Sequence, residues 1–272
     1  MFCYDLKQVT DPQGEHGVIW IILPAYNEAA CIGSLLDKID AAGQGIAGGF
    51  RVLVVDDGSA DGTGEAVRAH GLARRGLAAV TAHPRNMGLG AAMDTGIREF
   101  LERSAPGDVM VTMDADDTHE PSFIPSLLDA LDQGADVAIA SRFQPGGREV
   151  GVSFARRAFS RGVRVFMRLV APVPGVRDYS CGYRAYKRSA LEAGRRVFGD
   201  ALAESRHFSI MAELLIKLAA AGAGFREVPF TLRYDRKQGP SKIRISATLR
   251  GYLDLARMAR RARAQARTAR LR

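Results

Sequence analysis

The sequence predicts an α/β fold with a mainly parallel sheet and flanking helices, followed by a basic helix at the C-terminus. Short apolar runs of strand length alternate with longer segments whose apolar residues recur at helical spacing, which is typical of βαβ units. Acidic or polar residues directly follow several of these runs, and the carboxyl ends of parallel strands share one edge of a sheet. We therefore expect the functional site at that edge.

The expected elements follow a polar lead-in at residues 1–17. The first strand is a continuous apolar run that ends at Pro24, as in strands covered on both faces. The next helix has Ile32, Leu35 and Ile39 at helical spacing, and Asp61 is expected to cap the helix after it. Strands are predicted at 18–23, 51–55, 77–81, 109–113, 135–140 and 225–234. Further helices are predicted at 61–74, in a segment that ends near 103, at 121–131, 155–170 and 207–221, and from 245 onward. The segment 178–186 is predicted to be a strand or a loop.

The composition excludes several classes of protein. With 272 residues, 47% of them hydrophobic, the chain can bury a substantial core. The formal charge is +8, but the segment from Arg250 to Arg272 holds eight arginines and one acid, Asp254, so the remainder is nearly neutral, unlike a nucleic-acid-binding fold. Three cysteines without a CxxC spacing favour a reducing cytoplasm over a disulfide framework or a zinc site. No apolar run approaches the roughly 18 residues of a membrane span, and the polar N-terminus is unlike a signal peptide.

An acidic turn, Asp114-Ala115-Asp116-Asp117-Thr118-His119, follows the predicted strand at 109–113. If the backbone stays extended, Asp114 and Asp116 leave the chain on the same side. A hard divalent cation that bridges protein oxygens to phosphate oxygens would relieve their repulsion. The alternative is a solvated acidic turn that caps the next helix. His119 is expected to support the turn rather than to bind a metal.

The segment from 142 to 168 contains seven arginines and a single acidic residue, Glu149. Arg156, Ser160 and Arg164 recur at i, i+4 and i+8 of an amphipathic helix, which can collect a phosphate or lie on an anionic membrane. A solvated arginine face is the alternative. The chain has neither a GxxxxGK[ST] phosphate loop nor a GxSxG nucleophile elbow, and its dinucleotide fingerprint is incomplete.

Several motifs, taken in order, resemble the nucleotide-sugar half of the family-2 inverting glycosyltransferases with a GT-A (Rossmann-like) fold. These are Pro24-Ala25-Tyr26-Asn27-Glu28, Val54-Val55-Asp56-Asp57-Gly58-Ser59, Asn86-Met87-Gly88-Leu89-Gly90 and Asp114-Ala115-Asp116. The second half of the chain is similar to the polyprenyl- (dolichyl-) phosphate mannose synthase branch. That similarity is carried by Ser141-Arg142-Phe143, Arg156 with Ser160, Asp178 with Cys181-Gly182-Tyr183-Arg184-Ala185-Tyr186, Glu227-Val228-Pro229, and Arg236 with Gly239-Pro240-Ser241-Lys242.

The resemblance covers about residues 18–245 and implies a domain with a donor half (18–141) and an acceptor half (142–245), followed by a basic amphipathic helix or tail at 246–272. It implies a nucleotide-diphosphate hexose donor, GDP-mannose first and a glucose donor second, a Mg²⁺ or Mn²⁺ ion, and a polyprenyl phosphate acceptor. A carboxylate-held cation neutralises the leaving diphosphate as a Lewis acid. The metal ligands would be Asp114 and Asp116, the donor residues Pro24, Ala25, Tyr26, Glu28, Asp56, Asp57 and Gly88, and the acceptor residues Arg142, Arg156, Ser160 and Arg184, with Lys242 as a further phosphate partner.

An acceptor phosphate is already anionic and needs no general base, so its site requires arginines that bind and orient it.

The sequence departs from the branch at Thr118, where an amide side chain is common, so Asp117 or Thr118 could be the third metal ligand. The chain ends after one basic helix, which predicts peripheral attachment to the cytoplasmic face of a membrane, at about 1 kcal/mol per basic residue; a solvated tail is the alternative. A hydroxyl acceptor would require a carboxylate base, such as Glu204 or Glu213. A non-catalytic nucleotide-sugar-binding module is the second alternative.

Overall fold

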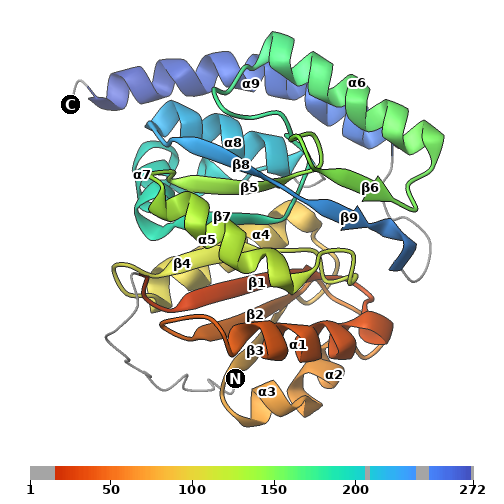
Figure 1. Ribbon diagram of the computed structural model, residues 1–272. Coiled ribbons are helices and arrows are strands. Elements are labelled where there is room, and N and C mark those ends of the chain that lie inside the picture. Colours follow the sequence, from red (N-terminus) through yellow and green to blue (C-terminus); the bar gives the residue numbers. More distant parts are fainter. Residues whose placement is uncertain (1–15, 206–208, 237–244, 271–272) are drawn as a thin grey trace.

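The computed structural model describes residues 16–205, 209–236 and 245–270 (Figure 1). Within them, seven strands form one sheet in the order β3-β2-β1-β4-β7-β5-β8. All neighbours pair in parallel except β7, which is antiparallel to both β4 and β5. A second, two-stranded sheet pairs β6 with β9 in parallel. The strands are β1 Ile19–Ala25, β2 Phe50–Asp56, β3 Ala78–Ala82, β4 Val109–Thr112, β5 Val137–Ser141, β6 Arg148–Val150, β7 Arg184–Lys187, β8 Phe225–Pro229 and β9 Thr231–Arg233.

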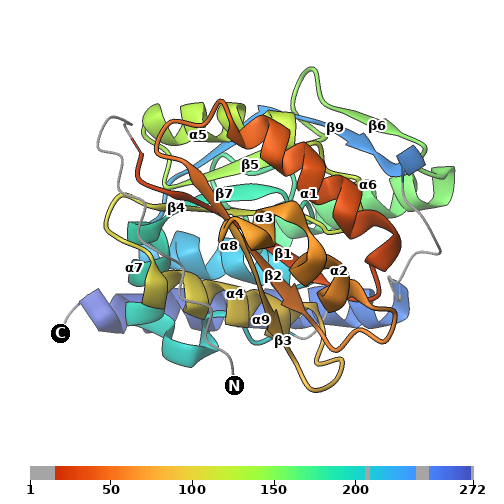
Figure 2. The same ribbon diagram turned by 90° about the horizontal axis from the view of Figure 1, so that it is seen from below.

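Helices cover both faces of the large sheet (Figure 2). The α-helices are α1 Ala29–Gly43, α2 Thr63–Ala69, α3 Gly71–Arg74, α4 Leu89–Arg103, α5 Ile124–Asp132, α6 Phe154–Val170, α7 Arg188–Phe198, α8 Ile210–Ala221 and α9 Ile245–Arg270. Side chains of α1, α2, α3 and α5 share one core cluster, and those of α4, α6, α7, α8 and α9 share the other. Strand β1 alternates between the two clusters, with Ile21 in one and Ile22 in the other, because successive strand side chains point to opposite faces. The predicted mainly parallel α/β architecture is confirmed.

The register of the strands brings the predicted site residues to one edge. Ala25, the last residue of β1, pairs with Asp56, the last residue of β2. Strand β4 pairs with β1 up to Thr112, two residues before Asp114. Strand β5 ends at Ser141, and β7 begins at the same edge because it runs in the opposite direction. The segments after β1, β2, β4 and β5 therefore lie along this edge together with the segment before β7.

Several elements differ from the sequence-based expectation. The helix expected at 61–74 is broken at His70, whose backbone is extended and whose side chain accepts a hydrogen bond from the Leu72 N–H. The segment expected as a strand or loop ends in the short strand β7, which leads directly into the unpredicted helix α7. The strand expected at 225–234 divides at Phe230 into β8 and β9, and β9 pairs with the unpredicted strand β6. Apolar periodicity does not identify such three-residue strands.

The C-terminal helix α9 packs on α6, α7 and α8 (Figure 1). It buries Leu255, Ala259, Ala262 and Ala266, which recur at three- and four-residue spacing along one side. The basic C-terminal helix is thus confirmed over the described residues, and it contributes to the core instead of forming a solvated tail. No helix in the described part of the chain is both long and apolar enough to span a bilayer.

Candidate active site

Backbone hydrogen bonds to side chains tie together the loops after β1 and β2. The Asn27 N–H donates to the Ser59 hydroxyl at 2.9 Å, and the Ala60 N–H donates to the Asn27 side-chain oxygen at 2.9 Å. The Glu28 N–H donates to the Thr63 hydroxyl, also at 2.9 Å. Of the residues predicted to contact the nucleotide, Pro24 and Ala25 end strand β1, and Tyr26 and Glu28 follow in the loop that these hydrogen bonds join to the loop after β2.

The two adjacent aspartates at the end of β2 have different surroundings. Both oxygens of Asp57 accept hydrogen bonds from the loop before α4, from the N–H groups of Met87 and Gly88 at 2.8 Å each. The His83 ring lies 2.7 Å from the same carboxylate. Asp57 thus holds the loop that carries Gly88, a role that sequence spacing alone does not reveal. Asp56 accepts a hydrogen bond from the Ser59 N–H at 2.9 Å.

The acidic turn begins two residues after β4. Asp116 accepts hydrogen bonds from the Thr118 hydroxyl at 2.6 Å and from the Thr118 N–H at 3.3 Å. The Asp114 N–H donates to Nδ1 of His119 at 2.9 Å, while His119 Nε2 lies 3.7 Å from the Asp114 carboxylate. The buried His119 ring stacks on Tyr183 with centroids 5.1 Å apart. His119 therefore supports the turn, as predicted from the sequence.

Asp117 is directed away from the turn. Its φ angle of 60° is in the left-handed region, and its two oxygens lie 2.7 Å and 2.6 Å from the Lys38 ammonium group on α1. The two candidates for a third metal ligand thus have other partners: Asp117 pairs with Lys38, and Thr118 hydrogen-bonds to Asp116. Within the described residues, no group of three or more His, Cys, Asp or Glu side chains could hold a metal ion.

The residues of the turn nevertheless fit Mg²⁺ or Mn²⁺. Mg²⁺ is usually bound through one or two carboxylates, with water and substrate phosphates completing its shell. Asp114 and Asp116 would supply such a pair. Gly182 lies against Asp114, since a Cβ atom at that position would be 3.0 Å from an Asp114 oxygen. A larger residue at position 182 would crowd Asp114.

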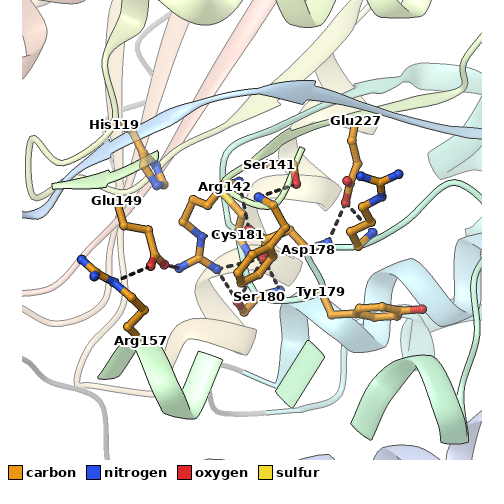
Figure 3. A network of polar contacts seen from close by, with 12 residues as sticks. His119, Ser141, Arg142, Glu149, Arg157, Asp178, Tyr179, Ser180, Cys181 and Glu227 are labelled. Atoms are coloured by element: carbon orange, nitrogen blue, oxygen red, sulfur yellow. Dashed lines mark hydrogen bonds and ion pairs between the residues drawn. The ribbon is translucent and has the colours of Figure 1, made fainter. Parts of the chain in front are cut away.

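Arg142 is fixed by a buried ion pair with Asp178, which Figure 3 shows at the centre of a polar network. Its Nε and one Nη donate to the two Asp178 oxygens at 2.8 Å and 2.9 Å, and the same Nη donates to the Ser180 hydroxyl at 2.7 Å. Burial opposes the charge of Asp178, but the Arg142 charge and its hydrogen bonds outweigh this and hold the pKa of Asp178 below its usual range. Burial likewise opposes the Arg142 charge, and Asp178 more than compensates and raises the pKa of Arg142.

Glu227 supports the loop that carries Asp178. One of its oxygens accepts the N–H groups of Arg177 and Asp178 at 2.6 Å each (Figure 3). Burial raises the pKa of Glu227. Burial also raises the pKa of the neighbouring Cys181 thiol to about 12, so this thiol is protonated at neutral pH and is a poor nucleophile. The loop from 177 to 181 therefore positions Arg142, and its Cys181 is not a candidate nucleophile.

A basic cavity of about 340 Å³ lies beside Arg142. The carboxylate of Glu149 lies 3.3 Å from Arg142 Nη1 and 3.4 Å from Arg157 Nε. Of the arginines that line the cavity, only Arg142 is predicted from the sequence as an acceptor residue; the excess of arginine between 142 and 168 is the signal that points to the others. The cavity is lined by Arg142, Phe143, Gly147, Arg148, Glu149, Val150, Arg157 and Arg161.

The other predicted acceptor residues lie in different surroundings. Arg156 packs over the Tyr234 ring at 4.4 Å and donates to its hydroxyl at 2.7 Å, and Ser160 is half-buried one turn further along α6. Arg184 has no exposed surface, and its guanidinium donates to backbone carbonyls of Met211 and Tyr179 at 2.6 Å and 3.2 Å. In this structure Arg184 therefore joins α8 to the loop before β7 and does not line the cavity. Lys242 lies outside the described residues.

The two candidate bases for a hydroxyl acceptor are engaged elsewhere. Glu213 is buried, pairs with Lys217, and accepts the N–H groups of Glu204 and Ser205 at 3.1 Å and 2.8 Å. Glu204 lies 2.9 Å from the same lysine and lines a separate cavity against α9. Neither carboxylate lines the arginine cavity.

The comparisons with known proteins place the chain in a family. The family model described as glycosyl transferase family 2 matches residues 20–195. The chain belongs to this family. Among curated proteins, it is 34% identical over 223 residues to the polyprenol monophosphomannose synthase of Mycolicibacterium smegmatis, covering 82% of this chain and 80% of that protein. It is also 34% identical to the dolichol-phosphate mannosyltransferase of Pyrococcus furiosus, covering 82% of this chain and 58% of that protein, and to the undecaprenyl-phosphate mannosyltransferase of Micrococcus luteus, covering 82% and 86%.

The solved structures agree on the fold. Glucosyl-3-phosphoglycerate synthase from Mycobacterium tuberculosis, in complex with phosphoglyceric acid, matches with a TM-score of 0.59 at 20% identity over 93% of this chain and 80% of that chain. The same synthase in complex with Mn²⁺, UDP and glucosyl-3-phosphoglycerate matches with a TM-score of 0.58. At this identity the match speaks for the fold alone, and the predicted GT-A fold of this family-2 glycosyltransferase is confirmed.

Proposed function

We propose that this family-2 glycosyltransferase transfers a hexose, mannose in preference to glucose, from a nucleotide-diphosphate sugar to a polyprenyl phosphate. The observation that carries the proposal is an arginine-lined cavity on the same sheet edge as a carboxylate turn. The arginine-lined cavity suits an anionic acceptor, and the carboxylate turn suits a metal-bound diphosphate. The names of the mannosyltransferases that are 34% identical to the chain support both the sugar and the lipid phosphate.

On the donor side, Asp114 and Asp116 would hold Mg²⁺ or Mn²⁺, which supplies Lewis-acid chemistry for the leaving nucleoside diphosphate. A structural neighbour is known in complex with Mn²⁺ or Mg²⁺ and UDP, which supports a divalent cation on the donor side. His119 keeps Asp114 in place, and Thr118 keeps Asp116 in place. Asp56, together with Pro24, Ala25, Tyr26 and Glu28, would contact the nucleotide, while Asp57 fixes the loop of Gly88.

On the acceptor side, Arg142 would hold the lipid phosphate in line with the anomeric carbon of the sugar, with Arg156 and Ser160 on α6 as further contacts. The phosphate oxygen attacks without losing a proton, so the reaction needs charge compensation and orientation rather than a base. A hydroxyl acceptor is less well supported because Glu213 is buried in an ion pair with Lys217.

The acceptor lipid would approach from the side of α6 and α9, which lie next to each other (Figure 1). Three large apolar side chains of α6 are exposed, Phe154 by 82%, Val165 by 59% and Leu169 by 78%. Arg161 and Arg168 are exposed on the same helix. Apolar side chains flanked by arginines suit the interface of an anionic membrane. We propose peripheral attachment of the enzyme through this surface, on the cytoplasmic face of the membrane.

The deciding experiment combines the protein with labelled GDP-mannose or UDP-glucose, Mg²⁺ or Mn²⁺, and a short-chain polyprenyl phosphate. A labelled lipid-linked sugar is expected, and its formation should stop when a chelator removes the metal. Transfer to a hydroxyl acceptor, with no lipid product from either donor, would refute the proposal. Binding of donor and metal with no transfer at all would instead favour a non-catalytic nucleotide-sugar-binding module.

A further inference from the structure

The side chain of Glu149 places a negative charge inside the arginine cavity. Its two oxygens lie 3.3 Å from Arg142 Nη1 and 3.4 Å from Arg157 Nε, and only 9% of the side chain is exposed (Figure 3). The carboxylate therefore bridges two guanidinium groups, as a bound phosphate would. The proposed reaction has no use for a carboxylate at this position.

The contacts of Glu149 are looser than those of the neighbouring ion pair. Charge-assisted N–H···O contacts in proteins are usually about 2.7–2.9 Å long. The two contacts between Arg142 and Asp178 have these lengths, at 2.8 Å and 2.9 Å, whereas both contacts of Glu149 are longer. Arg142 is thus held in place by Asp178 and Ser180, and its remaining Nη1 is the group that faces Glu149. Removal of Glu149 would leave Arg142 fixed and ready to bind another anion.

The backbone around Glu149 can yield at low cost. Glu149 is the middle residue of β6, a three-residue strand that pairs with β9 in a two-stranded sheet. A two-stranded sheet of this size has little stability of its own. Gly146 and Gly151 flank the strand with φ angles of 92° and 75°, values that glycine adopts without strain. Among the described residues, the strand that carries Glu149 is therefore paired with one short strand only.

We propose that Glu149 mimics the acceptor: its carboxylate occupies the place of the acceptor phosphate between Arg142 and Arg157, and the incoming lipid phosphate displaces it. This inference rests on the proposed function of the cavity. Because every anion must displace the Glu149 carboxylate, Glu149 weakens the binding of all anions in the cavity. Only a ligand that makes additional contacts, such as those of a polyprenyl chain, compensates for this cost. The residue thereby discriminates against free inorganic phosphate, a form of specificity that arises from a repulsive element.

The test compares Glu149→Gln with the wild type. Glutamine keeps the shape of the side chain and removes its charge. Glu192→Gln is the matched control, because Glu192 is an exposed carboxylate that pairs with Arg188 on α7, away from the cavity lining. We expect Glu149→Gln to lower the KM for a short polyprenyl phosphate about tenfold, equivalent to about 1.4 kcal/mol. The KM for the nucleotide sugar should stay unchanged, and Glu192→Gln should change neither value.

A binding measurement separates this inference from the proposed function. Titration calorimetry with inorganic phosphate needs no turnover, and it should give about tenfold tighter binding to Glu149→Gln than to the wild type. Equal or weaker phosphate binding by a folded Glu149→Gln variant, or a raised KM for the acceptor, would overturn the inference and make Glu149 an orienting residue for the arginines. If phosphate binds more tightly to the variant while no lipid acceptor is glycosylated, Glu149 still occupies an anion site, but the proposed function fails and the lipid phosphate is not the ligand that displaces it.

Discussion

Replacement of Asp178 by asparagine tests the ion pair that holds Arg142. The substitution keeps the size of the side chain, but one oxygen becomes an amide that points its hydrogens at the guanidinium group. The Arg142 guanidinium then stays largely buried. Among the described residues, its 3.3 Å contact with Glu149 is the ion pair that it keeps. Removal of one partner of a buried ion pair costs about 3–5 kcal/mol. The free energy of unfolding of Asp178→Asn, measured by urea denaturation at pH 7, should fall by about this amount.

The pH dependence gives the same prediction a second test. Because the pKa of Asp178 is lowered in the folded protein, its contribution to stability is present above the pKa of the unfolded chain, about 3.9 for an aspartate. It is lost as the pH falls through the lower pKa of the folded state. The difference in unfolding free energy between wild type and Asp178→Asn should thus be constant from pH 7 to about pH 5 and should shrink only in stronger acid.

Ser180→Ala is the control, since it removes the 2.7 Å hydrogen bond to Arg142 and keeps the charge pair. A loss of about 0.5–1.5 kcal/mol is expected for that variant. If Asp178→Asn destabilises the protein no more than Ser180→Ala, the reasoning is refuted, because the structure would then tolerate the unpaired Arg142. The KM for the lipid acceptor should rise in Asp178→Asn, while nucleotide-sugar binding stays the same.

Three further predictions concern other parts of the molecule. Asp116→Ala should lower sugar transfer at least about 10²-fold and weaken Mn²⁺ binding in the presence of nucleoside diphosphate; an unchanged calorimetric titration would remove Asp116 from the metal site. Lys38→Met should lower the unfolding free energy by no more than about 1 kcal/mol, because the partly exposed pair with Asp117 is screened by solvent; a larger loss in urea denaturation would contradict this. Leu169→Glu should reduce sedimentation with anionic lipid vesicles at least about tenfold without changing transfer to a water-soluble acceptor analogue, and equal vesicle binding would exclude α6 as the membrane contact.

The fold could be predicted because four strands of its large sheet, β1, β2, β4 and β5, are buried on both faces. The run ending at Pro24 and the run before Asp114 therefore lack alternation, and their polar ends identify one edge of the sheet. The position of Asp114 and Asp116 just after a strand and the supporting role of His119 could be predicted from the sequence, while their role as metal ligands stays a prediction. Such reasoning needs only local sequence and the direction of parallel strands.

The partners of individual side chains could not be predicted, because they are distant in sequence. Asp117 pairs with Lys38, 79 residues away, and the Asp57 carboxylate binds N–H groups about 30 residues further along the chain. Arg184 is part of a motif that indicates phosphate binding, but its complete burial becomes visible only in the folded chain. In the sequence Glu149 stands out only as the single acid among the seven arginines between 142 and 168, and its contacts with two of them are visible only in the structure.

The strand order has a consequence for how the protein is made. Strands β4 and β5 are not neighbours, because β7 lies between them and pairs with both. A nascent chain that ends near Ser141 lacks one of the two partners of β4 and both partners of β5, β7 and β8, and such unpaired strand edges invite association with other chains. The sheet closes only after β7 has left the ribosome, some 45 residues later at about 5–20 residues per second. The same late strand sets the spacing between carboxylate turn and Arg142, two strand separations or about 10 Å. The donor side needs only β1, β2 and β4, whereas the acceptor side takes its place beside it only when β7 has paired with both β4 and β5.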